Sequence, residues 1–231
     1  MRVVHILSTP ATDDPFDARW ADPDAPVNDP PWGVGVGASP HDLARIEARL
    51  AGSPAPGRLI VGSLAPPTGD PEEPRPTWTP GAVAGFDEAL GALVGRVGRV
   101  GLRIAVRPCV GHVVSDVPSA LSMLRRWEGR PVEVVVDPVL MLTPDGVGDA
   151  ADRIARIVEA FEGVEGAVGL VVGGTRIVGE RCVPGPPGEG PIPDEAWRLP
   201  VRAWAATGKP IVLCGGDAGI GRAWVSGLLG A

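Results

Sequence analysis

Residues 101–142, GLRIAVRPCVGHVVSDVPSALSMLRRWEGRPVEVVVDPVLML, constrain the fold more than any other stretch of the chain. They predict a strand over 102–106, a helix over 117–127 with Val117, Leu121 and Leu124 facing inward, and a strand over 132–136. Both strands are nearly continuous runs of Val, Ile and Leu, which is typical of strands buried on both faces of a parallel sheet. A unit of this kind predicts a parallel β/α architecture.

The same alternation continues along the chain. We expect further strands over 3–7, 58–64, 167–172 and 210–213, and a weak one over 33–37. Apolar residues at helical spacing predict helices over 83–97, 150–161 and 220–229, one that begins at Ser39, and a helical piece over 196–206 that Pro200 interrupts. We expect one domain, 1–231, with long Pro-, Asp- and Glu-rich loops at 10–32 and 65–80 and a Pro/Gly loop at 183–193.

Two folds fit this alternation: a (β/α) barrel of the TIM type and an open, doubly wound sheet. No GxGxxG motif follows the first predicted strand, which weakens the dinucleotide-binding version of the open sheet.

Composition excludes several classes of function. The net charge is −7, Lys occurs once, and there is no basic cluster beyond Arg125-Arg126, so we expect no nucleic-acid partner. No apolar run approaches the length of a membrane span, and the apolar run at 3–7 is too short for a secretory signal, so we predict a cytoplasmic protein. Cys109, Cys182 and Cys214 are far apart in sequence, which suggests neither a disulfide framework nor a zinc site.

Four segments together resemble a known family: GLRIAVRP, VEVVVDPVL, AVGLVVGG and GEGPIPDEAWRLPVRAWAATGKPIVL. In order and spacing they resemble the sugar phosphate isomerase/epimerase superfamily, the xylose isomerase-like TIM barrels, over about residues 58–216. The resemblance implies a parallel (β/α) TIM-type barrel, here shortened or irregular at its N-terminal end. It also implies a divalent metal at the carboxyl ends of the barrel strands, where it polarises a sugar while a carboxylate moves the proton.

Most of the ligand positions that the resemblance implies are not filled by ligands in this chain. Asp137 is retained, whereas the family's Glu corresponds to Arg107 and its next His to Leu140. The remaining ligand positions fall on Val171 or Val172, Gly173 or Gly174, and Cys214 or Gly215. Hard cations need several oxygen ligands. We therefore expect a degenerate site with no metal and no other cofactor, in which the Arg107 charge replaces the cation and pairs with Asp137.

Five residues are candidates for a functional site. Asp137 and His112 are candidate catalytic groups, since a carboxylate at a strand end and an imidazole in the next loop could move protons; the structural alternatives are a loop-capping Asp and an ordinary hydrogen-bonded His. Arg107 could bind a carboxylate or phosphate, or could only pair with Asp137. Gly216 and Arg222, in the loop GGDAGIGR at 215–222, could hold a phosphate, although Gly-rich turns also occur there for geometric reasons.

Three functions remain open. The first is a barrel related to the sugar isomerases and epimerases that has largely lost its metal site and is non-catalytic or a binding protein. The second is a metal-independent isomerase or epimerase acting on a sugar or sugar phosphate, and the third is an open-sheet protein that binds a nucleotide or phosphate through 215–222. The expected partner is a small sugar or phosphorylated ligand, with no nucleic acid and no membrane. A closed pair of Arg107 and Asp137 favours the first function, and an open pocket between them favours the second.

Overall fold

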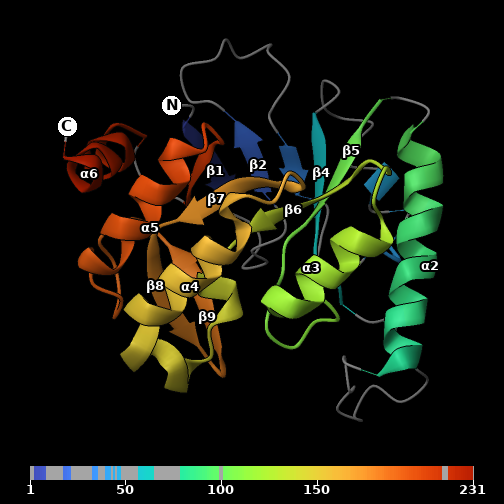
Figure 1. Ribbon diagram of the computed structural model, residues 1–231, viewed down its shortest axis with the longest axis horizontal. Helices are drawn as coiled ribbons and strands as arrows, with labels where there is room; N and C mark the ends of the chain where they lie inside the picture. The colour runs from blue at the N-terminus through green and yellow to red at the C-terminus, as the bar shows by residue number, and fades with distance from the viewer. Residues whose placement is uncertain are drawn as a thin grey trace.

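The strands form a closed ring (Figure 1). The computed structural model describes residues 3–8, 18–21, 33–35, 40–42, 44, 46–47, 57–64, 79–98, 101–214 and 218–230. In these ranges the ring runs in the order β1-β10-β7-β6-β5-β4-β3-β2. The strands are β1 (Val3–Ser8), β2 (Ala18–Ala21), β3 (Gly33–Gly35), β4 (Arg58–Val61), β5 (Arg103–Val106), β6 (Val132–Val136), β7 (Ala167–Val172) and β10 (Ile211–Cys214).

Neighbouring strands are parallel everywhere except on the two sides of β2, which pairs antiparallel with β1 and with β3. This confirms the predicted TIM-type barrel and its irregular N-terminal end. It also shows that the open-sheet alternative is wrong. The predicted loop at 10–32 contains β2, a strand that the sequence does not signal because ARWA has no apolar run and prolines lie on both sides.

Helices surround the barrel (Figure 1). They are α2 (Pro80–Val97), α3 (Val117–Arg126), α4 (Ala150–Glu162), α5 (Glu195–Ala206) and α6 (Ala218–Leu229), with the 3₁₀ helices η2 (Val139–Met141) and η3 (Pro144–Asp149) between β6 and α4. The predicted start at Ser39 lies outside the described residues, although the N–H of Ile46 donates to the carbonyl of Asp42 as in a helical turn.

Local sequence explains where the first two of these helices begin. The Thr79 hydroxyl accepts from the N–H of Ala82 at the start of α2, and Asp116 and Ser119 form a capping box at the start of α3. One helical expectation is corrected, because helix α5 continues through Pro200 without interruption. In α3, Val117, Leu121 and Leu124 pack against the core as predicted but are only partly buried, whereas Ala120 and Met123 are fully buried.

Alternate residues of each strand point to opposite sides of the barrel wall. One set packs outward against the helices in the large core, for example Leu59, Ile104 and Val134. The other set forms a separate apolar cluster inside the barrel: Ile60, Ala105, Val135, Val171 and Val212. The barrel interior is therefore filled by side chains and is not a channel.

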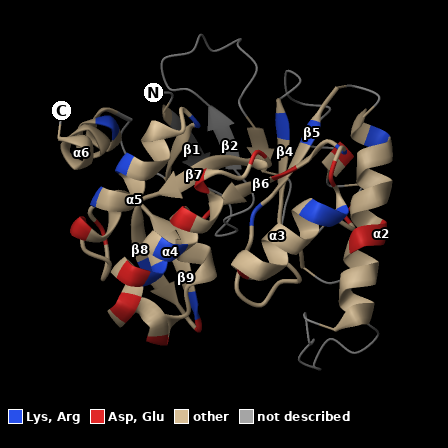
Figure 2. Ribbon diagram, viewed as in Figure 1, with Lys and Arg blue, Asp and Glu red and all other residues tan. Residues whose placement is uncertain are grey.

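Two charged layers lie above and below this inner apolar cluster. Arg58, Arg103 and Glu133 lie two residues before Ile60, Ala105 and Val135, so they face the interior at the amino ends of the strands; we call them the amino-end layer. Figure 2 shows Lys or Arg segments at the starts of β4 and β5. At the other end, Arg107, Asp137 and Cys214 lie two residues after Ala105, Val135 and Val212, and we call them the carboxyl-end layer.

Candidate functional site

Arg107 and Asp137 form a closed ion pair in the carboxyl-end layer. The Nε of Arg107 donates to Oδ2 of Asp137 at 2.8 Å, and its Nη2 donates to the same oxygen. The exposed fractions of the two residues are 1% and 0%. The N–H of Arg107 donates to the carbonyl of Val61, which extends the β4–β5 ladder and holds the arginine over the apolar interior. The pair therefore fills the end of the barrel and does not line an open pocket.

Two influences on the pKa of Asp137 oppose each other. Burial raises the pKa of the carboxyl group, while the Arg107 guanidinium lowers it by charge and by hydrogen bonding. The N–H of Leu140 donates to Oδ1 at 3.2 Å, so the second carboxylate oxygen also has a partner. Asp137 thus caps the loop after β6 and pairs with Arg107 at the same time, as its structural interpretation predicts.

His112 is buried in the loop that follows β5. Its exposed fraction is 2%, and its Nδ1 accepts the N–H of Ser63 at 3.2 Å. Burial, and next the positive charge of Arg181, lower the pKa of the imidazole to about 4, so His112 is neutral near neutral pH. The hydrogen bond from Ser63 to His112 joins the loop after β4 to the loop after β5.

Ser63, which we did not select from the sequence, strengthens this connection. Its hydroxyl accepts the N–H of Val114 at 2.8 Å and donates to the carbonyl of the same residue. Its own carbonyl accepts the N–H of Val113. The N–H of Val110 donates in turn to the carbonyl of Leu140 in the loop after β6. The loops after three neighbouring strands are therefore bonded to one another at the end of the barrel.

A β-hairpin that the sequence analysis did not predict follows β7. It consists of β8 (Gly174–Val178) and β9 (Arg181–Gly185), and β9 includes the first part of the predicted loop at 183–193. The signal was present in the sequence, because TRIV and RCV flank a two-residue Gly-Glu turn, and Gly179 has a positive φ of 58°. The hairpin packs against η2, so it stands at the carboxyl end of the barrel (Figure 1).

Cys214 completes the carboxyl-end layer as a neutral thiol. Burial raises its pKa to about 11, and the opposing charges of Arg107 and Asp137 both act on it. A thiol with so high a pKa stays protonated near neutral pH and is therefore a poor nucleophile. Of the loop at 215–222, Gly216 lies outside the described residues, and Arg222 is a half-buried residue of α6 that has an interaction partner. The proposed phosphate contact of these two residues stays a prediction.

The described residues of the carboxyl-end layer do not fit a divalent metal. Within the described part of the chain, no three His, Cys, Asp or Glu side chains lie close enough together to hold one. In the carboxyl-end layer, the carboxylate of Asp137 is already bonded to a guanidinium, and the neighbouring Cys214 is protonated. No oxygen-rich set of ligands of the kind that hard cations require is formed by these residues.

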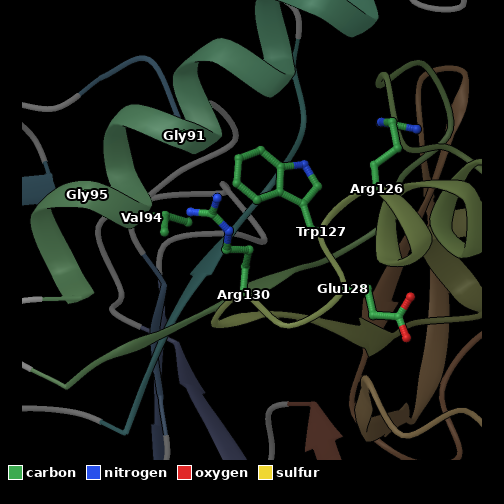
Figure 3. A pocket seen from close by; sticks show the side chains of 7 residues that line it. All are labelled: Gly91, Val94, Gly95, Arg126, Trp127, Glu128 and Arg130. Atoms are coloured by element: carbon green, nitrogen blue, oxygen red, sulfur yellow. The ribbon is translucent and has the colours of Figure 1, made fainter.

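Two surface grooves lie away from the carboxyl ends of the strands, around the turn between α3 and β6. Figure 3 shows the first, in which Trp127 and Arg130 point toward α2 while Glu128 points away. Arg126 is paired with Asp87, which also accepts from the indole N–H of Trp127. Arg103 of the amino-end layer lines the second groove. Neither groove contains any of the five candidate site residues.

Solved structures of other proteins share this architecture. The apo form of the 3-keto-D-glucoside 4-epimerase YcjR from E. coli has a TM-score of 0.53 at 14% identity, over 86% of this chain and 78% of the other. The probable 3-DHS dehydratase AsbF of Bacillus anthracis, involved in petrobactin synthesis, has a TM-score of 0.50 at 8% identity, over 75% and 62%. The chain has a TIM-type barrel fold.

These likenesses show the fold that the sequence resemblance implied. The aligned part of this chain spans less than two thirds of the dehydratase. No family model and no curated protein matches the chain. None of the helices in the described ranges is long and apolar enough to cross a membrane.

Proposed function

We propose that the chain is a divergent member of the xylose isomerase-like superfamily that has lost the metal site and works as a non-catalytic binding protein. The buried Arg107–Asp137 pair carries this proposal. The guanidinium supplies the positive charge that a cation would supply, and it is bonded to Asp137, the carboxylate of the carboxyl-end layer that could serve as a ligand or a base. A cytoplasmic location, predicted from the sequence, belongs to the same proposal.

Burial supports a binding role over a catalytic one. A catalytic acid or base must come within hydrogen-bond distance of the substrate. Asp137 has no exposed surface and both of its oxygens accept hydrogen bonds, while His112 uses Nδ1 on the backbone of Ser63. A substrate would have to break the ion pair before it could use either partner.

The alternative is a metal-independent isomerase or epimerase. Two observations favour it: His112 is neutral and could accept a proton near neutral pH, and the similar structure from E. coli is named as an epimerase. This alternative requires the loops after β4 and β5 to separate, because their hydrogen bonds to one another hold His112 in place.

Metal content tests the proposal most directly. The purified chain is analysed by inductively coupled plasma mass spectrometry and titrated with Mn²⁺, Mg²⁺ and Zn²⁺ by calorimetry. We expect no stoichiometric metal in either experiment. One tightly bound equivalent, lost in an Asp137→Asn variant, would contradict the proposal.

Isotope exchange tests the alternative. The chain is incubated in D₂O with a panel of ketoses, aldoses and their phosphates, and the loss of substrate C–H signal is followed by NMR. The proposal predicts no exchange above that of a heat-denatured sample. Exchange that Asp137→Asn or His112→Asn abolishes, in variants shown by circular dichroism to be folded, would establish the alternative.

A further inference from the structure

The β8–β9 hairpin presents two arginines on one of its faces. In its register Arg176 lies opposite Val183, and Val178 lies opposite Arg181. Opposite residues of an antiparallel pair share a face, as do residues two apart on one strand, so Arg176 and Arg181 are diagonal neighbours on the same face. Such neighbours lie about 7–8 Å apart, within reach of two long side chains.

Gly173 lets the base of the hairpin pack closely beside the barrel. A Cβ atom on Gly173 would lie 2.5 Å from the carbonyl oxygen of Gly185 and 3.4 Å from Cβ of Cys214. A Cβ atom on Gly185 would lie 3.5 Å from Cγ of Arg176. The Arg176 side chain therefore crosses the bare backbone of Gly185, next to the carboxyl-end layer.

The charges of the two arginines act on the end of the barrel. Arg176 acts electrostatically on the thiol of Cys214. Arg181 acts on the imidazole of His112, and its Nη2 lies 4.0 Å from the Cβ position of Gly111. The opposite face of the hairpin carries the buried residues Thr175, Cys182 and Pro184. The arginine face is therefore the exposed one, and its two guanidinium groups lie near the carboxyl-end layer and the loop after β5.

These two guanidinium groups have no counter-charge. Both arginines are exposed, and neither forms an ion pair with any residue in the described ranges. The negative charge of Asp137 is already balanced by Arg107. Glu180 and Glu189, the nearest acids along the chain, are exposed and are not paired with either arginine. Among the described residues, the carboxyl end of the barrel therefore carries two unbalanced positive charges, whereas the whole chain has a net charge of −7.

We propose that Arg176 and Arg181 form an oxyanion-binding site over the carboxyl end of the barrel, which takes a small ligand with a carboxylate or phosphate group. Guanidinium groups suit this role because they donate planar, charge-assisted hydrogen bonds to both kinds of oxyanion. This site defines the class of ligand that the proposed binding protein would take. The inference rests on the proposed function, because a metal ion bound below the hairpin would compete with the two arginines for the same anion.

Calorimetric titration of the full chain tests the site. The probes are inorganic phosphate and malonate, in low-salt buffer that has been passed over a chelating resin so that no metal takes part. The variants are Arg176→Gln, Arg181→Gln and the double change. The matched control is Arg125→Gln, which changes an exposed arginine in the last turn of α3 that also has no ion-pair partner among the described residues.

We expect at least one of the two anions to bind with a stoichiometry of one. Each single variant weakens binding about tenfold, since one charge-assisted hydrogen-bonding partner is lost, and the double variant abolishes it. Arg125→Gln leaves binding unchanged, and added salt weakens binding to the wild-type chain. Binding of malonate alone identifies a carboxylate ligand, and binding of phosphate alone identifies a phosphorylated one.

Two results would overturn the site: no binding of either anion, or equal binding by the wild-type chain and the double variant. Circular dichroism confirms that the variants are folded, which we expect because both side chains are exposed. The proposed function fails separately, through a stoichiometric metal or isotope exchange, so the two failures can be distinguished.

Discussion

The two ends of the barrel interior both carry arginine–carboxylate clusters, and they differ in charge balance and in access to water. In the carboxyl-end layer one guanidinium meets one carboxylate, with side-chain exposures of 1% and 0%. In the amino-end layer Glu133 is bonded to two arginines, Arg58 at 2.7 Å and also Arg103, and these arginines are 22% and 49% exposed. Counted over these described residues, the first cluster is balanced and buried, and the second has a net positive charge and is partly exposed.

This difference bears on where a ligand could act. TIM-type barrels use the carboxyl ends of their strands for chemistry and the amino ends for stability. Here the carboxyl end is the one that is closed by a neutral pair, and the free charges lie in the hairpin above it. The buried pair at this end is thus part of the core, whereas Arg176 and Arg181 of the hairpin are exposed.

The largest expected effect comes from breaking the carboxyl-end pair. Arg107→Ala leaves the Asp137 carboxylate buried without its partner, which should lower the free energy of unfolding by about 3–5 kcal/mol. Urea denaturation followed by circular dichroism measures the loss. A loss below about 1 kcal/mol would show that the pair is hydrated in solution.

The double variant Arg107→Met, Asp137→Leu serves as its control. Replacing both charges with apolar side chains removes the cost of burying them, so it should recover most of the stability that Arg107→Ala loses. If the loss of unfolding free energy in the double variant equals the sum of the losses from the two single changes, the two residues are not energetically coupled.

Lowering the pH should destabilise the folded chain through His112, which is buried at the same end of the barrel. Burial, then the charge of Arg181, lowers its pKa from 6.5 to about 4 in the folded chain. Between pH 4 and pH 6.5 the unfolded chain binds more protons than the folded one. The contribution of His112 to the free energy of unfolding is therefore fully present above pH 6.5 and falls as the pH drops toward 4. At about 1.4 kcal/mol per pKa unit, the loss approaches about 3 kcal/mol.

Unfolding free energies measured across this pH range test the effect, with His112→Asn as the comparison. The Asn amide oxygen can accept the Ser63 N–H in place of Nδ1 but does not titrate. The variant should lack this part of the pH dependence. The same slope in both proteins would mean that other groups cause it.

At the amino end, Glu133→Gln should have a smaller effect than Arg107→Ala. The change removes the charge between Arg58 and Arg103, but water already reaches both arginines and can solvate them. We expect a loss of about 1–3 kcal/mol in urea denaturation. A loss as large as that of Arg107→Ala would mean that the two layers are equally dry.

Arg103→Ala should have the smallest effect, below about 1 kcal/mol, because half of this side chain is exposed and Glu133 keeps Arg58 as a partner. The same denaturation experiment measures it. A larger loss would indicate that Arg103 is needed to hold Glu133 in its buried position.

The sequence predicts the parts of this fold that are encoded locally. The strands β6 and β7 lie where their Val-rich runs place them, and α4 extends one residue beyond its predicted end. The Arg107–Asp137 pair is also predictable, since both residues directly follow neighbouring parallel strands. Whether the pair is open or closed depends on loops from other parts of the chain, which no local pattern encodes.

The sequence also contains a pattern that predicts the ion pairs of the amino-end layer. Arg103 precedes Arg107 by four residues and Glu133 precedes Asp137 by four, so each pair shares the inner face of a strand. The same reasoning that joined Arg107 to Asp137 therefore predicts a contact between Arg103 and Glu133. Strand β2 could not be found in this way, because it has four residues, no apolar run and an antiparallel direction.

The way in which the ring closes has a consequence for synthesis on the ribosome. Strand β1 pairs in parallel with β10, from Val3 with Ile211 to Ile6 with Cys214. Until β10 has left the exit tunnel, β1 has only the short β2 beside it, and one of its edges lacks a partner. The nascent chain must therefore keep an apolar strand edge from aggregating for most of its translation, which makes this edge a natural place for a chaperone to act.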